Sequence, residues 1–112
     1  MSLSGAEAEE RACLLLKELG YMIVARNWRS RYGEIDIIAR DGSTIVFVEV
    51  KARSSRGFGG PDAAVDIGKQ RRIASTAGQF LQQTRCELQA RFDVVTFSGE
   101  RPSVYRDAFR IR

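Results

Sequence analysis

Apolar residues recur at helical spacing in the first twenty positions of the chain. They stand three or four residues apart and comprise Ala8, Ala12, Leu15, Leu16 and Leu19. Ser4 followed by Glu7 has the spacing of a capping box, and Gly20 supplies a stop signal. The pattern predicts an amphipathic helix over about residues 5–19.

The pattern then changes to runs that are typical of β-strands. Tyr21–Trp28 is rich in β-branched and aromatic residues and is followed by a polar break at Arg29–Gly33. Two further runs, Glu34–Arg40 and Thr44–Arg53, flank the dipeptide Asp41-Gly42. An Asp-Gly pair between two such runs predicts a β-hairpin.

The second half of the chain predicts one helix and two strands. A Gly-rich loop, Ser54–Pro61, precedes a helix that runs from Asp66, a good N-cap, to about Gln83. Its apolar face carries Ile73, Ala74, Ala77, Phe80 and Leu81. Arg91–Ser98 and Ser103–Ile111 are the last two strands.

The resulting order is α-β-β-β-α-β-β. Three consecutive strands predict an antiparallel meander, and the second helix is a crossover that sets the fourth strand parallel to the third. The fold class is therefore α/β, with a mixed five-stranded sheet flanked by helices. With 112 residues, 44% of them hydrophobic and 29% charged, the chain predicts a single domain spanning residues 1–112.

Composition excludes several kinds of chemistry. The chain has no histidine, which excludes Ser-His-Asp and Cys-His nucleophile systems, His-ligated zinc and an imidazole base. Cys13 and Cys86 show no metal-binding spacing, and we interpret both as thiols in a reducing compartment. The chain has neither an apolar run of membrane-spanning length nor a signal-peptide pattern. These features predict a cytoplasmic protein without a membrane partner.

The formal net charge of +4 is unevenly divided. Residues 1–51 carry a net charge of −1, and residues 52–112 carry +5. This division indicates a polyanionic partner that contacts the second half, or equally an ordinary solvated surface rich in arginine.

The predicted hairpin places its side chains on two different faces. One face is apolar and consists of Ile35, Ile37, Val46, Val48 and Val50. The other face carries Glu34, Asp36, Glu49 and Lys51. If the loop has two residues, Arg40 pairs with Ser43 and Asp36 lies diagonal to Glu49. If it has four, Arg40 pairs with Ile45 and Asp36 lies directly opposite Glu49. Either register brings the two carboxylates to within roughly 5–8 Å.

Two like charges at this separation repel unless a cation lies between them. Lys51 supplies one positive charge, and an oxygen-preferring ion such as Mg²⁺ or Mn²⁺ would supply the rest. The alternative is an exposed strand face on which acids and lysine simply alternate with the core valines. Ile38, Ile45 and Phe47 share this face, so part of it must be covered, and covered carboxylates are costly unless paired or coordinated.

One acidic residue of the predicted first helix, Glu9, is placed where it could approach the face that carries Asp36 and Glu49. Glu9 lies about 80° from the centre of the apolar stripe, whereas Glu7 and Glu10 point further away. Glu9 is thus either directed at the Asp36/Glu49 site or a boundary residue with its carboxylate in water.

The chain resembles the YraN-like family of small, largely uncharacterised bacterial proteins. The matching residues are Glu9, Arg26-Asn27-Trp28, Gly33-Glu34-Ile35-Asp36, Phe47-Val48-Glu49-Val50-Lys51, Phe58-Gly59, Lys69 and Arg91-Phe92-Asp93. That family is similar to the restriction-endonuclease-like superfamily and to archaeal Holliday-junction resolvases. The superfamily signature is an acid, a spacer and (D/E)-x-K, here Asp36 and Glu49-Val50-Lys51, on a core of the same α-β-β-β-α-β order.

The resemblance implies a metal-dependent endonuclease. Its catalytic residues would be Glu9, Asp36, Glu49 and Lys51, and Asp36, Glu49, the Val50 carbonyl and Glu9 would bind Mg²⁺ or Mn²⁺. Lys51 would orient the attacking water. Glu34 is either a supporting carboxylate or a rim residue without a catalytic part. Because junction resolvases use two sites, the resemblance also allows a homodimer.

Basic residues follow this site in the sequence, and they are either phosphate-binding or part of a solvated helix start. They are Arg53, Arg56, Lys69, Arg71 and Arg72. Phe58 in the Gly-rich loop either stacks on a base or is buried and anchors the loop. The loop lacks the spacing of a nucleotide-binding P-loop.

Two functions of different kinds follow from the sequence. The first is a Mg²⁺- or Mn²⁺-dependent endonuclease that cleaves DNA, with branched, Holliday-junction-like or damaged DNA as candidate substrates. The second is a non-catalytic nucleic-acid-binding or adaptor protein that retains the nuclease fold.

Overall fold

A computed structural model of the chain describes residues 3–53 and 65–110. Its elements, in order, are α1 (Gly5–Glu18), β1 (Met22–Ser30), β2 (Gly33–Asp41), β3 (Thr44–Arg53), α3 (Ile67–Thr84), β4 (Gln89–Ser98) and β5 (Arg101–Tyr105). The strands form one sheet in the order β1-β2-β3-β4-β5. Only β3 and β4 are parallel. The predicted α/β class, element order and mixed five-stranded sheet are confirmed, and Arg56 and Phe58 lie outside the described residues.

Both helices begin where their caps predict. Ser4 and Glu7 form the reciprocal capping box of α1, with the Ser4 N–H donating to Glu7 Oε1 at 2.8 Å. The Asp66 side chain accepts a 2.8 Å bond from the Lys69 N–H and caps α3. Helix α3 ends at Thr84, followed by Arg85 in a left-handed conformation. In the described ranges, neither helix is long and apolar enough to cross a membrane.

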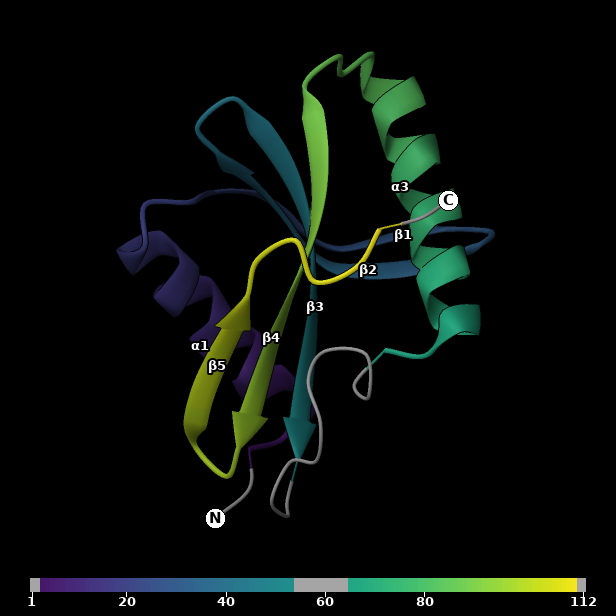
Figure 1. Cartoon of the computed structure of the whole chain (residues 1–112). Helices are drawn as coiled ribbons and strands as arrows, with labels where there is room; N and C mark the ends of the chain where they lie inside the picture. The colour runs from purple at the N-terminus through teal and green to yellow at the C-terminus, as the bar shows by residue number, and fades with distance from the viewer. Residues whose placement is uncertain (1–2, 54–64, 111–112) are drawn as a thin grey trace.

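The two helices cover opposite faces of the sheet (Figure 1). On one face, Ala12 and Leu16 of α1 pack against Val46 and Val48 of β3. On the other, Ile73 and Phe80 of α3 belong to the cluster that buries Phe47. Helix α3 thus covers Ile38, Ile45 and Phe47, so the acid-bearing face of the hairpin is covered as predicted.

The hairpin adopts the register that sets Asp36 opposite Glu49. Arg40 pairs with Ile45 and Asp41 with Thr44, so the turn consists of Gly42 and Ser43. Gly42 has a positive φ of 63°, which glycine adopts without steric cost. The ladder continues to the pair Ile37–Val48, and Asp36 and Glu49 come next on the two strands.

The assignment of Ile35 to the apolar face shared with Ile37 is wrong. Ile35 is fully buried in the α3-side cluster, whereas Ile37 belongs to the α1-side cluster. The pairing of β2 with β3 stops at Ile37, while β2 continues beside β1, where Ile35 pairs with Trp28. The β1–β2 hairpin therefore leaves the plane of the other strands and extends beneath α3 (Figure 1).

Two predicted boundaries also differ from the structure. The break at Arg29–Gly33 shrinks to a turn at Arg31 and Tyr32, because the strand pairing reaches the pair Ser30–Gly33. The last strand ends at Tyr105 instead of Ile111. Asp107 then takes a positive φ of 53°, which turns the chain so that Phe109 is buried in the α3-side cluster.

A fully buried carboxylate, Asp93 of β4, holds several elements together on the α1 side. Its Oδ2 accepts a 2.8 Å bond from the Tyr21 hydroxyl, which precedes β1, and a 3.0 Å bond from the Arg91 guanidinium. Its Oδ1 accepts bonds from Arg91 Nε at 2.8 Å and from the Asp107 N–H at 2.9 Å. Arg91 also binds Asp41 at 2.9 Å, so the charge of Arg91 is shared between two acids. Burial and the bond to Asp93 raise the pKa of Tyr21 to about 12.

Candidate metal centre

Asp36 and Glu49 lie side by side on adjacent strands of the α3-covered face. The Val50 N–H donates a 2.8 Å hydrogen bond to Asp36 Oδ2 and fixes that carboxylate against β3. Glu49 is 3% exposed, which is rare for a glutamate unless it is paired. The spacing of the two acids in the sequence thus becomes a pair of carboxylates on one face of the sheet.

The two oxygens of Glu49 have different environments. Its Oε2 forms an ion pair with Lys69 Nζ at 3.4 Å, and the Lys69 side chain is 39% exposed. Its Oε1 is buried and receives no hydrogen bond from the residues that the structure describes. A buried acceptor without a partner is costly, so this oxygen is a ready ligand for a cation.

The shared burial changes how both acids ionise. Burial, and then the charge of Asp36, raise the pKa of Glu49 to about 8, although Lys69 opposes the shift. Burial also raises the pKa of Asp36, against the Val50 hydrogen bond and the charge of Lys69. Both acids therefore favour a neighbouring cation over two unscreened charges.

A cavity of about 360 Å³ opens beside the pair. Gly33, Glu34, Asp36 and Glu49 line its acidic side, and Lys69, Arg72 and Ile73 line the side formed by α3. Gly33 has a φ of 153°, which favours glycine, at the point where the β1–β2 turn approaches α3. Acidic and basic groups thus face one another across this cavity.

Glu9 reaches the neighbourhood of this pair from α1. Burial, followed by the charge of Asp36, raises the pKa of Glu9, while a hydrogen bond with the Asn27 side chain lowers it. Asn27 lies on β1 between the pairs Arg26–Ile37 and Trp28–Ile35, which sets it across from Asp36. The structure thus joins Glu9 to the site electrostatically.

No three Asp, Glu or Cys side chains within residues 3–53 and 65–110 come close enough to hold one metal ion together. The protein donors that do adjoin are the carboxylates of Asp36 and Glu49. This set, with the unpartnered Oε1, fits a hard divalent cation such as Mg²⁺ or Mn²⁺, which prefers a few carboxylate oxygens and keeps coordinated water. The structure gives Val50 a bond through its N–H, and its carbonyl as a ligand stays a prediction.

The predicted basic residues separate into two groups. Lys69 and Arg72 line the cavity, whereas Arg71 is exposed on α3 and does not line it. Lys51 is exposed on β3, and no ion pair joins it to either acid in the described part of the chain. Arg53 closes β3, and its side chain, like Arg56, is outside what the structure describes.

Sequence reasoning missed two features of the site. Lys69, and not Lys51, is the cation at Glu49, although both were singled out for other reasons. Asn27 has a positive φ of 52° in the middle of β1, which no sequence pattern signalled. Glu34, for which the sequence left a supporting or a rim position open, lines the cavity and pairs with Arg29 at 2.6 Å.

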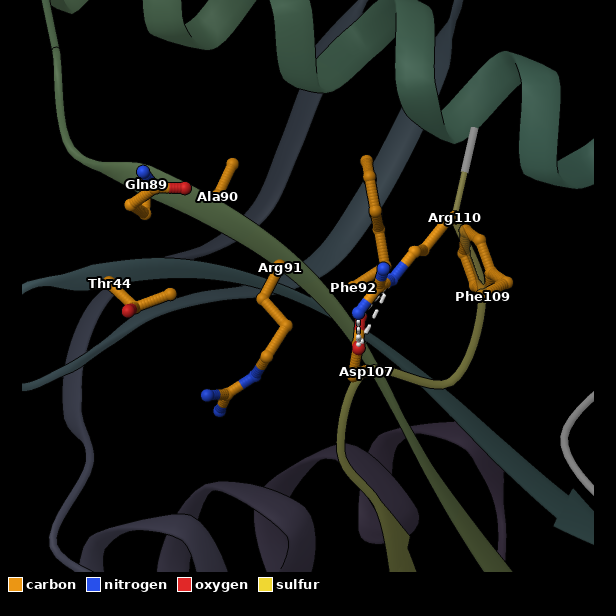
Figure 2. A pocket seen from close by; sticks show the side chains of 8 residues that line it. All are labelled: Thr44, Gln89, Ala90, Arg91, Phe92, Asp107, Phe109 and Arg110. Carbon is orange, nitrogen blue, oxygen red and sulfur yellow. Dashed lines mark hydrogen bonds and ion pairs between the residues drawn. The ribbon is translucent and has the colours of Figure 1, made fainter. Parts of the chain in front are cut away.

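A second, larger cavity of about 600 Å³ lies at the starts of β3 and β4, away from the carboxylate pair (Figure 2). Its lining includes Arg91, Phe92, Asp107, Phe109 and Arg110. The charges there are already paired, because Arg110 binds Asp107 at 2.7 Å and Arg91 binds Asp93. We therefore place the candidate site at the smaller cavity, where a buried oxygen still lacks a partner.

The fold and the site define a mixed α/β protein in which a buried and a half-buried carboxylate adjoin, next to a cationic helix start. Residues 8–97 match the family described as "Uncharacterised protein family UPF0102", and the chain belongs to that family. It is 48% identical to the UPF0102 protein of Rhodococcus jostii over 111 residues, which cover 94% of both chains. It is 47% identical to the UPF0102 protein of Alkalilimnicola ehrlichii over 108 residues, or 95% of this chain and 86% of that one. The UPF0102 protein of Persephonella marina is 41% identical over 108 residues, or 96% and 93%. The expected membership of an uncharacterised bacterial family is thus confirmed.

Proposed function

We propose that this protein is a metal-dependent endonuclease that hydrolyses DNA phosphodiester bonds and belongs to the restriction-endonuclease-like superfamily. One observation carries the proposal: a half-buried Asp36 adjoins a buried Glu49, and one Glu49 oxygen has no partner among the described residues beside a cavity edged with cations. A protein that only binds nucleic acid gains nothing from two carboxylates that repel phosphate. The motif Asp36 and Glu49-Val50-Lys51 and the resolvase-like element order support the same assignment.

In this proposal, Asp36 and Glu49 hold Mg²⁺ or Mn²⁺, with the Val50 carbonyl as a further ligand. Such an ion, when bound, lowers the pKa of a coordinated water and neutralises charge on the scissile phosphate. The Val50 N–H keeps Asp36 in place while it acts as a ligand. Glu9, whose pKa is raised by burial and by the charge of Asp36, serves as an outer acid of the site.

The basic groups have separate tasks in the proposal. Lys51 follows the acidic pair on β3, and its ammonium orients the attacking water and stabilises the charge that builds up on the phosphate. Arg72 lines the cavity and binds the DNA backbone next to the site. Arg53, Arg56 and Arg71 extend this backbone contact, and a homodimer with two such sites stays a prediction.

The test is a cleavage assay with Mn²⁺ on linear, nicked, flapped and four-way DNA. We expect the natural chain to cut at least one of these and Glu49→Gln to cut on the order of a hundredfold more slowly, because it loses a metal ligand. Glu100→Gln is the matched control. It makes the same substitution at an exposed glutamate that pairs with Arg11, and this variant should keep the cleavage activity of the natural chain.

Three outcomes separate the candidate functions. Cleavage that depends on Glu49 and on the divalent ion supports the endonuclease. Binding of DNA without any cleavage, unaltered in Glu49→Gln and steeply dependent on salt, favours the non-catalytic binding protein. Absence of both Mn²⁺ binding and cleavage contradicts the enzyme.

A further inference from the structure

Lys69 occupies an unusual position for a cation. It lies in the first turn of α3, where its own N–H is capped by Asp66 and no acidic side chain belongs to that turn. The N-terminal turn of a helix carries partial positive charge, which disfavours a lysine there. The Lys69 ammonium pairs with Glu49 Oε2 at 3.4 Å, so the local cost is offset by a contact between α3 and β3.

The contact also occupies space that a divalent ion would need. Asp36, Glu49 and Lys69 line the same cavity, and the ammonium contacts the oxygen next to the unpartnered Oε1. An ammonium and a divalent cation on one carboxylate repel each other strongly at such short distances. Lys69 has a long side chain that is 39% exposed, so it is free to turn toward solvent.

The position of Arg72 indicates where the Lys69 ammonium would lie after it leaves Glu49. It is one helical turn after Lys69 and lines the same cavity. Its guanidinium passes 3.6 Å from the position that a Cβ on Gly68 would take, next to Lys69 along the helix. Two cations on one side of a cavity whose other side is acidic form a suitable contact for a phosphate that bridges to the acidic pair.

We propose that Lys69 is an exchangeable partner of Glu49: its ammonium contacts Glu49 Oε2 in the metal-free protein, leaves when a divalent ion binds, and then contacts a substrate phosphate beside Arg72. This inference rests on the proposed function, because it assigns the metal to the same two carboxylates. Lys69 then competes with the metal for Glu49, and it positions the substrate through the contact with its phosphate.

The first experiment measures Mn²⁺ binding by calorimetry without DNA. Lys69→Gln should bind Mn²⁺ about five- to tenfold more tightly than the natural chain, because no ammonium competes for Glu49. Lys69→Met should behave in the same way. Arg71→Gln is the charge-matched control on the same helix, outside the cavity, and its dissociation constant should stay within about twofold of the natural value.

The second experiment measures DNA binding by fluorescence anisotropy, in EDTA and in Ca²⁺, another oxygen-preferring ion. In EDTA, Lys69 is engaged with Glu49, so Lys69→Gln should weaken binding less than about twofold. In Ca²⁺, the same variant should weaken binding about tenfold and reduce the salt slope by about one ion. Arg71→Gln should have the same effect in both conditions.

The inference is overturned if Lys69→Gln binds Mn²⁺ no more tightly than Arg71→Gln, or if its effect on DNA binding is independent of the metal. If the natural chain binds Mn²⁺ and cleaves DNA in that case, the proposed function stands and only the part of Lys69 is wrong. If the natural chain binds no Mn²⁺, the proposed function fails and this inference fails with it.

Discussion

Asp93 and Glu49 are both buried carboxylates on neighbouring strands, yet they differ in how many of their oxygens have hydrogen-bond partners. Asp93 is paired with Val48 of β3 and faces the α1 side, where both of its oxygens accept hydrogen bonds. Glu49, the next residue of β3, faces α3 with one unpartnered oxygen and one ion pair to a partly exposed lysine. A satisfied buried acid stabilises a fold, whereas an unsatisfied one is a cost that persists where a ligand offsets it.

The pKa values support the same contrast. Burial raises the pKa of Glu49 to about 8, so the metal-free site resists two negative charges. At the Asp93 cluster, hydrogen bonding to Asp93 raises the pKa of Arg91 and thus stabilises the charged guanidinium. The Asp93 cluster is stabilised by charges and hydrogen bonds within the chain, whereas Glu49 has one ion pair and one oxygen without a partner among the described residues.

The largest expected effect is at Asp93. Asp93→Asn should reduce the free energy of unfolding by about 3–5 kcal/mol, because it breaks the ion pair at a fully buried carboxylate and leaves the half-buried Arg91 with Asp41 alone. Urea unfolding followed by circular dichroism measures this loss. Glu49→Gln should lose far less, and a loss as large as that of Asp93→Asn would break the comparison.

The next effect concerns pH in the absence of metal. Glu49 has a folded pKa of about 8 against an ordinary value of 4.5, so folding favours its protonated form. Its stabilising contribution is therefore complete below about pH 4.5 and is lost as the pH rises through about 8. Relative to Glu49→Gln, the natural chain should lose about 3–4 kcal/mol of stability between pH 5 and pH 8 in EDTA.

Thermal unfolding at several pH values tests that sign. Excess Mn²⁺ should remove the decline, because metal binding requires the ionised carboxylate and strengthens as the pH rises. If the stability of the natural chain changes with pH in the same way as that of Glu49→Gln, the Glu49 carboxylate is as well satisfied by its partners as that of Asp93.

The smallest effect concerns a single member of the Asp93 cluster. Tyr21→Phe removes a hydroxyl that donates to Asp93 and accepts from Arg91, both at 2.8 Å. The expected loss is about 1–2 kcal/mol, because Asp93 keeps its bonds to Arg91 and to the Asp107 N–H. Urea unfolding measures it, with no change expected in Mn²⁺ affinity; altered Mn²⁺ binding would mean that the two clusters are coupled.

The sequence alone was sufficient for the order of elements. Hydrophobic periodicity and caps at Ser4 and Asp66 defined both helices, and alternation defined the hairpin that carries Asp36 and Glu49. Those signals are local, acting over a few residues, so no tertiary contact is needed to detect them. The same locality explains the errors at Ile35 and after Tyr105, where a twist of β1–β2 and a turn at Asp107 depend on packing against α3.

Only the tertiary structure decided which groups complete the site. The sequence held two registers open, and the fold selected the one that sets Asp36 opposite Glu49. It also brought Lys69 to Glu49 from a helix eighteen residues further along the chain, and Asn27 toward Glu9 from a neighbouring strand. Such contacts depend on how helices lie against a sheet, and no periodicity records that. The sequence therefore determined that an acidic pair exists, and the fold determined that one Glu49 oxygen is buried without a hydrogen bond from the described residues.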